Sequence, residues 1–309
     1  MPNFPSRCAS SPTIAAPSSN NAWAWGPEQD CGLKLTVLVD NNTLIDRYFQ
    51  SEPGLSLLIE DNGRTILFDC GYSDLFLKNA LKMGLSLSDL DFVILSHGHM
   101  DHTWGLEALT RHFCELRLEG RPCPRPALVA HPAAFISISL DNCPEIGSLL
   151  EPGKLSRHYD LMLDAAPRLI SERLLFLGGI PRRNTFERTE GMGIKDGEKT
   201  ADLIPDDSAL VYRGSEGLVI ITGCSHAGIC NIVDQAMALT GESRIADIIG
   251  GLHLLSPSRG RLEGTVEYLR QVGPRTLSPC HCTDLRSKIA LAAVAPLREV
   301  GVGLTVTYR

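Results

Sequence analysis

The residues Ser96-His97-Gly98-His99-Met100-Asp101-His102 are the most informative stretch of this 309-residue chain. A short apolar run before them predicts a buried strand, Phe92–Leu95, and the spacing after them predicts a helix, Thr103–Phe113. Packing cannot explain four potential metal ligands in six residues, because burying that many polar groups without partners costs several kcal/mol. A metal ion removes this cost, since neutral imidazole and carboxylate bind zinc, iron and manganese.

The spacing of the four ligands suggests two metal positions. His97 and His99 point the same way from an extended loop, so that both can bind one ion. Asp101 and His102, on the turn into the helix, face a second position beside the first. The alternative, a solvated surface cluster of histidines, is disfavoured by the buried strand that leads into the motif.

Strand and helix patterns alternate on both sides of this motif. The predicted strands are Leu33–Val39, Leu55–Glu60, Thr65–Phe68, Ala127–Ala130, Ser208–Tyr212, Leu218–Thr222, Ile245–Ile249, Thr276–Ser278 and Gly303–Tyr308. The predicted helices are Ser73–Met83, Ala133–Leu140, Asn231–Leu239, Leu262–Gln271 and Ser287–Val300. Each half of the chain thus has hairpins followed by alternating helices and strands, which predicts two α/β layers packed face to face.

The remaining segments set the expected domain organisation. Residues 1–30 are rich in Pro and Ser and form a predicted tail, although Trp23 and Trp25 could dock on the domain or on a neighbouring subunit. Residues 31–309 form a single predicted domain. Its least regular part, about 140–200, is the expected substrate loop region.

Composition excludes several classes of protein. The net charge of −7 provides no general basic field for nucleic acid or anionic lipid, and no apolar run approaches the ~18–20 residues that span a bilayer. The ten cysteines are scattered, with no secretory leader before them, which favours reduced thiols in the cytoplasm. Homo-oligomerisation stays open, and the expected partner is a small molecule.

Three further stretches complete a resemblance to the metallo-β-lactamase superfamily, which carries the same His-x-His-x-Asp-His motif. They are Phe68-Asp69-Cys70-Gly71, Ile221 to Gly228 with Cys224 and His226 inside it, and Ser278 to Cys282 around His281. The resemblance implies a four-layer αβ/βα sandwich, in which two mixed β-sheets carry helices on their outer faces. The metal ions of that fold lie at one edge, between the sheets.

Within the superfamily the chain resembles the branch of the 7,8-dihydropterin-6-methyl-4-(β-D-ribofuranosyl)-aminobenzene-5′-phosphate synthase-like proteins. The matching stretches are Leu38–Thr43, Gly179–Arg182, Thr222–Ile229, Gly250–Leu254 and Pro279–Thr283.

The resemblance also implies two sets of metal ligands. The first metal site takes His97, His99 and His226, and the second takes Asp101, His102 and His281. Asp69 is expected to steady the metal loop through hydrogen bonds rather than as a ligand. The bridging aspartate of the superfamily has no clean counterpart. Cys224 is either a further ligand or a small buried packing residue, and Asp206 and Asp207 are the other candidates for this place.

The resemblance implies two divalent ions, with zinc as the expected metal and manganese or iron as alternatives. Such a metal pair predicts hydrolase chemistry. A metal pair lowers the pKa of a bound water toward ~7, so that a hydroxide can attack an ester, phosphoester or related group. Asp101 and His253 are the expected catalytic residues, with His253 alternatively an extra ligand or a core histidine. Arg182 and Arg183 are expected to bind an anionic or phosphorylated substrate, because Arg donates two parallel hydrogen bonds.

Three other functions remain open on the sequence alone. A transferase resembling the synthase would bind a pyrophosphate leaving group at the metals. A mononuclear iron dioxygenase could use the same histidines. A ligand-binding or regulatory protein could keep the fold without turnover.

Overall fold

The computed structural model describes residue 25 and residues 32–187, 191–197 and 200–309, and its main strands form two sheets. The strands of the seven-stranded sheet lie in the order β15 (Thr305–Tyr308), β1 (Leu33–Val39), β2 (Ser56–Asp61), β3 (Arg64–Phe68), β4 (Phe92–Ile94), β5 (Ala127–Ala130) and β7 (Asp160–Leu163). Those of the six-stranded sheet lie in the order β14 (Thr276–Cys280), β13 (Ile245–Gly251), β12 (Gly217–Thr222), β11 (Ala209–Gly214), β9 (Leu174–Phe176) and β8 (Arg168–Leu169). Both sheets mix parallel and antiparallel pairs.

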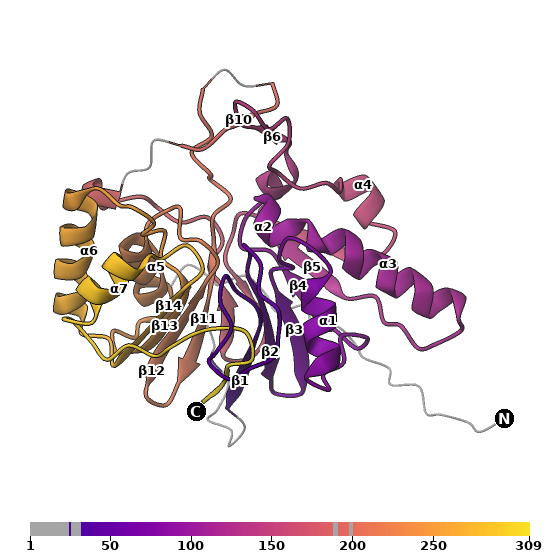
Figure 1. Cartoon of the computed structure of the whole chain (residues 1–309), viewed down its shortest axis with the longest axis horizontal. Coiled ribbons are helices and arrows are strands. Elements are labelled where there is room, and N and C mark those ends of the chain that lie inside the picture. Colours follow the sequence, from indigo (N-terminus) through magenta and orange to yellow (C-terminus); the bar gives the residue numbers. More distant parts are fainter. Residues whose placement is uncertain (1–24, 26–31, 188–190, 198–199) are drawn as a thin grey trace.

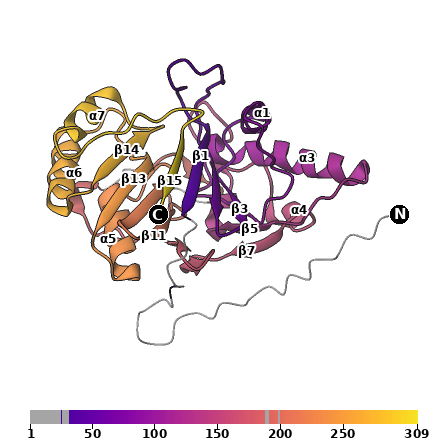
Figure 2. The same ribbon diagram turned by 90° about the horizontal axis from the view of Figure 1, so that it is seen from below.

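Helices cover the outer face of each sheet, which gives four layers (Figures 1 and 2). On the first sheet lie α1 (Leu75–Lys82) and α3 (Gly105–Leu118), and on the second lie α5 (Ile229–Thr240), α6 (Arg259–Val272) and α7 (Leu285–Leu291). The predicted αβ/βα sandwich is confirmed.

Alternating residues within single strands explain why both faces of a sheet are covered. In β12, Val219 and Ile221 pack into the core between the sheets, while Leu218 and Ile220 pack against the helices. In β2, Leu57 faces the core between the sheets and Leu58 faces the helices. Strands that are apolar on both faces must be covered on both faces.

The prediction of a helix over Ala133–Leu140 is wrong. The chain forms a short 3₁₀ helix, η1 (Pro132–Phe135), which Pro132 begins and the His131 side chain caps, and then a short strand, β6 (Ile138–Ser139). β6 pairs with β10 (Ile194–Lys195), which is far away in the sequence. Local periodicity carries no information about such a partner.

The prediction of one helix over Ser287–Val300 is also wrong beyond α7. Asp284 caps α7, and the helix ends at Leu291. Pro296 lacks the amide hydrogen that a continuing helix needs, and Leu297 instead forms a bridge with Leu277 of β14.

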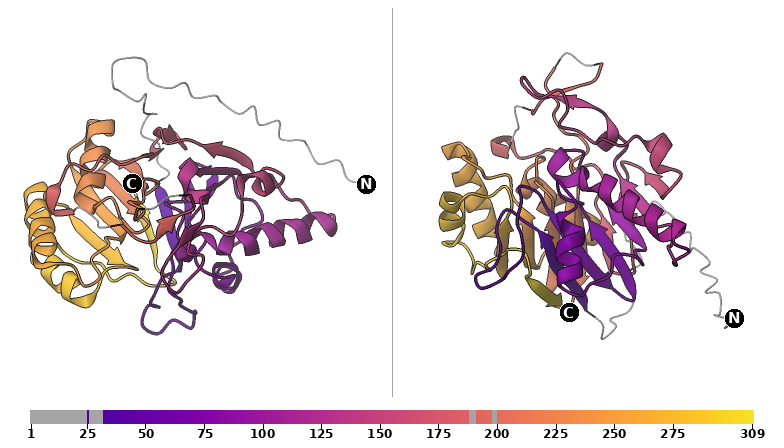
Figure 3. Two further views of the ribbon diagram at one scale, coloured as in Figure 1. Left: turned by 90° about the horizontal axis from the view of Figure 1, so that it is seen from above. Right: turned by 45° about the vertical axis from the view of Figure 1, so that its right-hand side comes forward.

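Residues 136–147, 191–197 and 200–204, which we call the flap, contain β6 and β10 and stand above the sandwich at the end where α2 (Met100–Thr103) lies (Figures 1 and 3). Two short helical turns, α4 (Pro152–Leu155) and η2 (Thr185–Glu187), complete the elements.

Two observations concern the remaining expectations. Trp25 is half-buried, with the Arg213 guanidinium 5.7 Å from its ring centroid, whereas Trp23 and the rest of residues 1–30 lie outside the described residues. Within the described ranges, no helix is both long enough and apolar enough to cross a membrane.

Candidate metal centre

The predicted ligands meet at one edge of the sandwich because they follow the ends of strands. Asp69 follows β3 and His97 follows β4, and these two strands are parallel. Cys224, His253 and His281 follow β12, β13 and β14, which are also parallel to one another. The carboxyl ends of parallel strands lie at the same edge of a sheet, so both halves of the chain contribute to one site.

Three buried histidines form one group of possible ligands, the histidine trio: His97, His99 and His226. Their ligand nitrogens lie within 4.8 Å of one another, and His97 Nε2 is 3.1 Å from His99 Nδ1. Neither ring nitrogen of His226 has a hydrogen-bond partner in the described part of the chain. Neutral imidazoles with unpaired buried nitrogens are costly, and a cation bound among them removes that cost.

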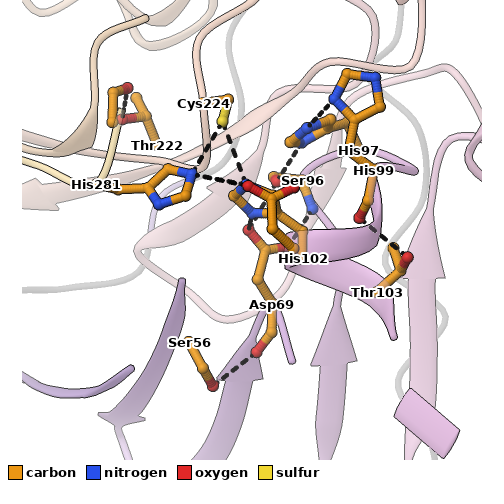
Figure 4. A network of polar contacts seen from close by, with 12 residues as sticks. Ser56, Asp69, Ser96, His97, His99, His102, Thr103, Thr222, Cys224 and His281 are labelled. Carbon is orange, nitrogen blue, oxygen red and sulfur yellow. Dashed lines mark hydrogen bonds and ion pairs between the residues drawn. The ribbon is translucent and has the colours of Figure 1, made fainter. Parts of the chain in front are cut away.

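Four residues form the second group, the mixed quartet: Asp101, His102, Cys224 and His281. The last three of them are labelled in Figure 4. The Cys224 sulfur is 3.2 Å from Nε2 of His102 and 3.2 Å from Nε2 of His281. These two nitrogens are 3.2 Å apart, and the Asp101 carboxylate is 3.3 Å from the second of them. Ligands ~2.0–2.3 Å from a tetrahedral zinc ion lie ~3.3–3.8 Å from one another, so the donor set fits such an ion.

A single carboxylate orients a histidine in each group. Asp69 is fully buried, and its Oδ2 accepts hydrogen bonds from His102 Nδ1 and from the Ser96 hydroxyl, both at 2.7 Å. Because the Ser96 proton is donated to Asp69, the 2.9 Å contact between Ser96 Oγ and His97 Nδ1 needs the imidazole proton. Both rings therefore carry a proton on Nδ1, which makes Nε2 the nitrogen that would bind metal, after loss of its own proton in the case of a charged ring.

Asn41 orients the ring of His281, since the Oδ1 of Asn41 lies 2.9 Å from Nδ1 of His281 and can accept its proton in a hydrogen bond. The sequence reasoning missed both Ser96 and Asn41 as parts of the site. The signal for Ser96 was its place directly before the histidine motif.

The two groups differ in their electrostatics. Burial and the neighbouring histidines hold the pKa values of His97 and His226 well below the usual range, so these rings are neutral. Burial opposes the charge on His102 as well, but Asp101 and Asp69 raise the pKa of His102 to about 9. Burial alone would raise the pKa of Asp101, yet His102 and His281 lower it.

Four residues that follow these strands adopt the left-handed backbone conformation. Asp69, Ser225, His253 and His281 have φ angles of 59°, 63°, 49° and 51°, in the left-handed region that side chains other than Asn and Asp seldom adopt. Hydrogen bonds hold this conformation at Asp69, whose amide donates to Ile94 and whose carbonyl accepts from Ser56. Conformations of this kind concentrate at functional sites.

Asp206 and Asp207 lie outside both ligand groups and hold the ligand loops instead. Asp206 accepts from the Gly98 amide at 2.8 Å, and Asp207 accepts from the Ala227 amide at 2.8 Å. Burial raises the pKa of Asp207 to about 7. The buried Lys195 of the flap lies 3.2 Å from Asp206, so one chain of contacts links the flap to the histidine motif.

His253, Arg182 and Arg183 differ in how they relate to the histidine trio. The ring centroid of His253 is 4.2 Å from that of His226, and Nδ1 of His253 is buried without a partner among the residues described. Arg182 donates to the Ile204 carbonyl, and its charge helps to lower the pKa of His226. Arg183 is exposed, and among the contacts between described residues none joins its guanidinium to the ligand groups.

Comparison with known proteins agrees with this geometry. The family model of the metallo-β-lactamase superfamily matches residues 51–113, which include the histidine motif. The uncharacterized protein MJ0448 of Methanocaldococcus jannaschii is 32% identical over 259 residues, which cover 84% of this chain and 93% of that protein. This chain belongs to the metallo-β-lactamase superfamily.

Two other proteins are similar to this chain along most of their length. The 7,8-dihydropterin-6-methyl-4-(β-D-ribofuranosyl)-aminobenzene-5′-phosphate synthase of the same archaeon is 28% identical over 274 residues, 83% of this chain and 89% of the synthase. The crystal structure of Tm1679, a metal-dependent hydrolase of the superfamily, has 29% identity and a TM-score of 0.73. Its alignment covers 89% of this chain and 98% of Tm1679.

Proposed function

We propose that the protein is a metal-dependent hydrolase that binds two divalent cations and acts on a small ester, phosphoester or related substrate. Zinc is the expected metal at both positions. The observation that carries the proposal is the adjacency of the histidine trio and the mixed quartet. The rings of His97 and His102, one from each group, are 4.3 Å apart between centroids. Two ions held this close could act on one substrate atom.

The protein's own residues have separate parts in this proposal. Bound divalent cations would supply Lewis acidity and activate water at neutral pH. The Asp101 side chain is 28% exposed, so its carboxylate can accept a hydrogen bond from an incoming water. His253, unpaired at Nδ1 beside His226, is placed to donate a proton to a leaving oxygen. Asp69 acts as a positioning residue through His102 and Ser96.

A second candidate is a transferase of the kind named for the synthase relative, which is supported by 28% identity along most of both chains. In that case the same two cations would bind the pyrophosphate leaving group of the substrate. The two candidates share the metal centre and differ in the nucleophile, which is water in one and an aromatic carbon in the other.

The deciding experiment combines metal analysis with a substrate panel. Protein purified without chelators should hold two zinc or manganese ions per chain by mass spectrometry. It should also turn over at least one member of a panel of esters, thioesters and phosphodiesters. His99→Ala should abolish turnover, whereas His112→Ala, outside both ligand groups on α3, should not.

Other results would point elsewhere. One iron per chain would indicate the dioxygenase. Two ions without hydrolysis, but with release of pyrophosphate from a phosphoribosyl donor, would indicate the transferase. Tight binding of a metabolite without any turnover would refute the enzyme proposal altogether.

A further inference from the structure

We propose that Arg261, together with Arg182 and His253, forms an oxyanion-binding position beside His226, which selects substrates that carry a phosphate or carboxylate group. Its role in substrate choice rests on the proposed function, whereas its ability to bind an oxyanion does not. Arg261 belongs to none of the motifs that the sequence singles out.

The topology places Arg261 at the metal edge of the molecule. α6 is the crossover helix after β13 and begins at Arg259, eight residues after that strand ends at Gly251. The first turn of a crossover helix lies at the carboxyl edge of the strand before it, where the ligands gather. The Ser258 side chain fixes this turn by accepting a hydrogen bond from the Arg261 amide.

The Arg261 guanidinium has unused donors. Its Nε and Nη2 are buried and have no hydrogen-bond partner among the described residues. Glu187 is the carboxylate that acts most strongly on the Arg261 charge, but it already accepts from the amides of Cys230 and Asn231 at 2.9 and 3.0 Å. Buried guanidinium donors without an acceptor are expensive, and an oxyanion provides two acceptors in the geometry of the arginine fork.

Two other groups share this neighbourhood. Arg261 interacts electrostatically with Arg182, an exposed side chain that in turn lowers the pKa of His226, so both positive charges act on the surroundings of this candidate ligand. His253 adds a third unused polar atom, since Nδ1 of this ring is buried without a described partner, 4.2 Å from His226 between ring centroids. An oxyanion bound among these groups would offset the repulsion between the two positive charges and supply acceptors for the unpaired donors.

The test measures anion binding by the zinc-loaded protein. Inorganic phosphate and succinate are titrated calorimetrically into the wild type, Arg261→Met and Arg259→Met. Arg259 is the matched control, because it lies two residues away in the same helix, 84% exposed and paired with Glu263. We expect Arg261→Met to raise the dissociation constant of the preferred anion about 10- to 100-fold, and Arg259→Met to change it less than about twofold. If the affinity for phosphate falls in Arg261→Met, the position binds phosphate groups, and if the affinity for succinate falls, it binds carboxylates.

Metal content and circular dichroism establish that the variants are folded and loaded, so that binding at the metals is common to all of them. If Arg261→Met does not fold, Arg261→Gln is measured against the same threshold. Equal affinity of wild type and variant for both anions would overturn the proposal.

Kinetics then separate this inference from the proposed function. For the ester pair phenyl butyrate and monophenyl succinate, the preference for the anionic member should fall about tenfold or more in Arg261→Met. Hydrolysis with an unchanged preference and unchanged anion affinity would overturn the anion position alone. Arg261-dependent phosphate binding without hydrolysis of any substrate would refute the proposed function and support the anion position.

Discussion

Asp69 offers the most direct test of how the metal centre is organised. Its carboxylate accepts three hydrogen bonds of 2.7 Å, from the Ser96 amide, the Ser96 hydroxyl and His102 Nδ1. In Asp69→Asn one oxygen becomes an NH₂ group, so at least one of these donors must face another donor. Loss of such a partner lowers metal affinity about 10- to 100-fold, or ~1.4–2.7 kcal/mol. The mixed quartet should lose its ion first, because the histidine trio contacts Asp69 only through Ser96.

Competition with a chromophoric chelator measures both affinities. The same change also removes a negative charge that raises the pKa of His102, so protons would compete less with the metal for this ring. Metal titrations at both pH 7 and pH 9 separate this effect from the loss of ring orientation. Asp61→Asn is the control, since Asp61 is also buried in this sheet but accepts from Ser171, outside the site. Retention of both ions in Asp69→Asn within threefold of wild-type affinity at pH 9 would refute the reasoning.

Three further outcomes are expected. The pKa of His102 in the metal-free protein, about 9 despite burial, lies above the unfolded value of ~6.5. The charged ring therefore stabilises the fold fully below pH 6.5, and this stabilisation is lost as the pH rises through 9. Urea titrations should show a fall of up to about 3 kcal/mol in the free energy of unfolding over this range, and the fall should be absent in His102→Gln. Cobalt-loaded protein should show a sulfur-to-metal charge-transfer band that Cys224→Ser lacks, and an unchanged spectrum would exclude the thiolate as a ligand. Gly223→Ala would place a methyl group 2.1 Å from Ser96 Oγ, so thermal melting should show a loss of about 2 kcal/mol or more, whereas Gly260→Ala, in open space on α6, should leave stability equal or higher.

Much of the fold could be predicted because most elements depend on local patterns. β1 runs over Leu33–Val39 and β5 over Ala127–Ala130, as the period-two and continuous apolar patterns predict. The failures lie where distant residues determine the conformation. β6 exists because Ile194 and Lys195 lie beside it, and nothing between residues 133 and 140 encodes that pairing.

The candidate site shows the same division. The histidine motif could be interpreted from its spacing, and the later ligands from their motifs and their places after strands. The resemblance predicts Asp101, His102 and His281 as one group, but it leaves the role of Cys224 open, since the place of this residue beside them depends on how the two sheets pack. Asn41 and Arg261 have common residue types and no diagnostic spacing, and Ser96 is marked only by its place directly before the histidine motif. Only the three-dimensional arrangement brings their polar atoms to the centre.

The late position of two elements has a consequence for how the protein is made. His281 completes the mixed quartet, and β15, which pairs with the first strand of the domain, lies at Thr305–Tyr308. A ribosome synthesises the chain from its N-terminus, so the histidine motif emerges long before its last partner. The first sheet cannot be completed before residues 305–308 have been translated, and the mixed quartet cannot form before residue 281. The quartet could therefore enclose a cation only after residue 281 has been synthesised, and a chain truncated before that residue would expose its early histidines without the last member of the group.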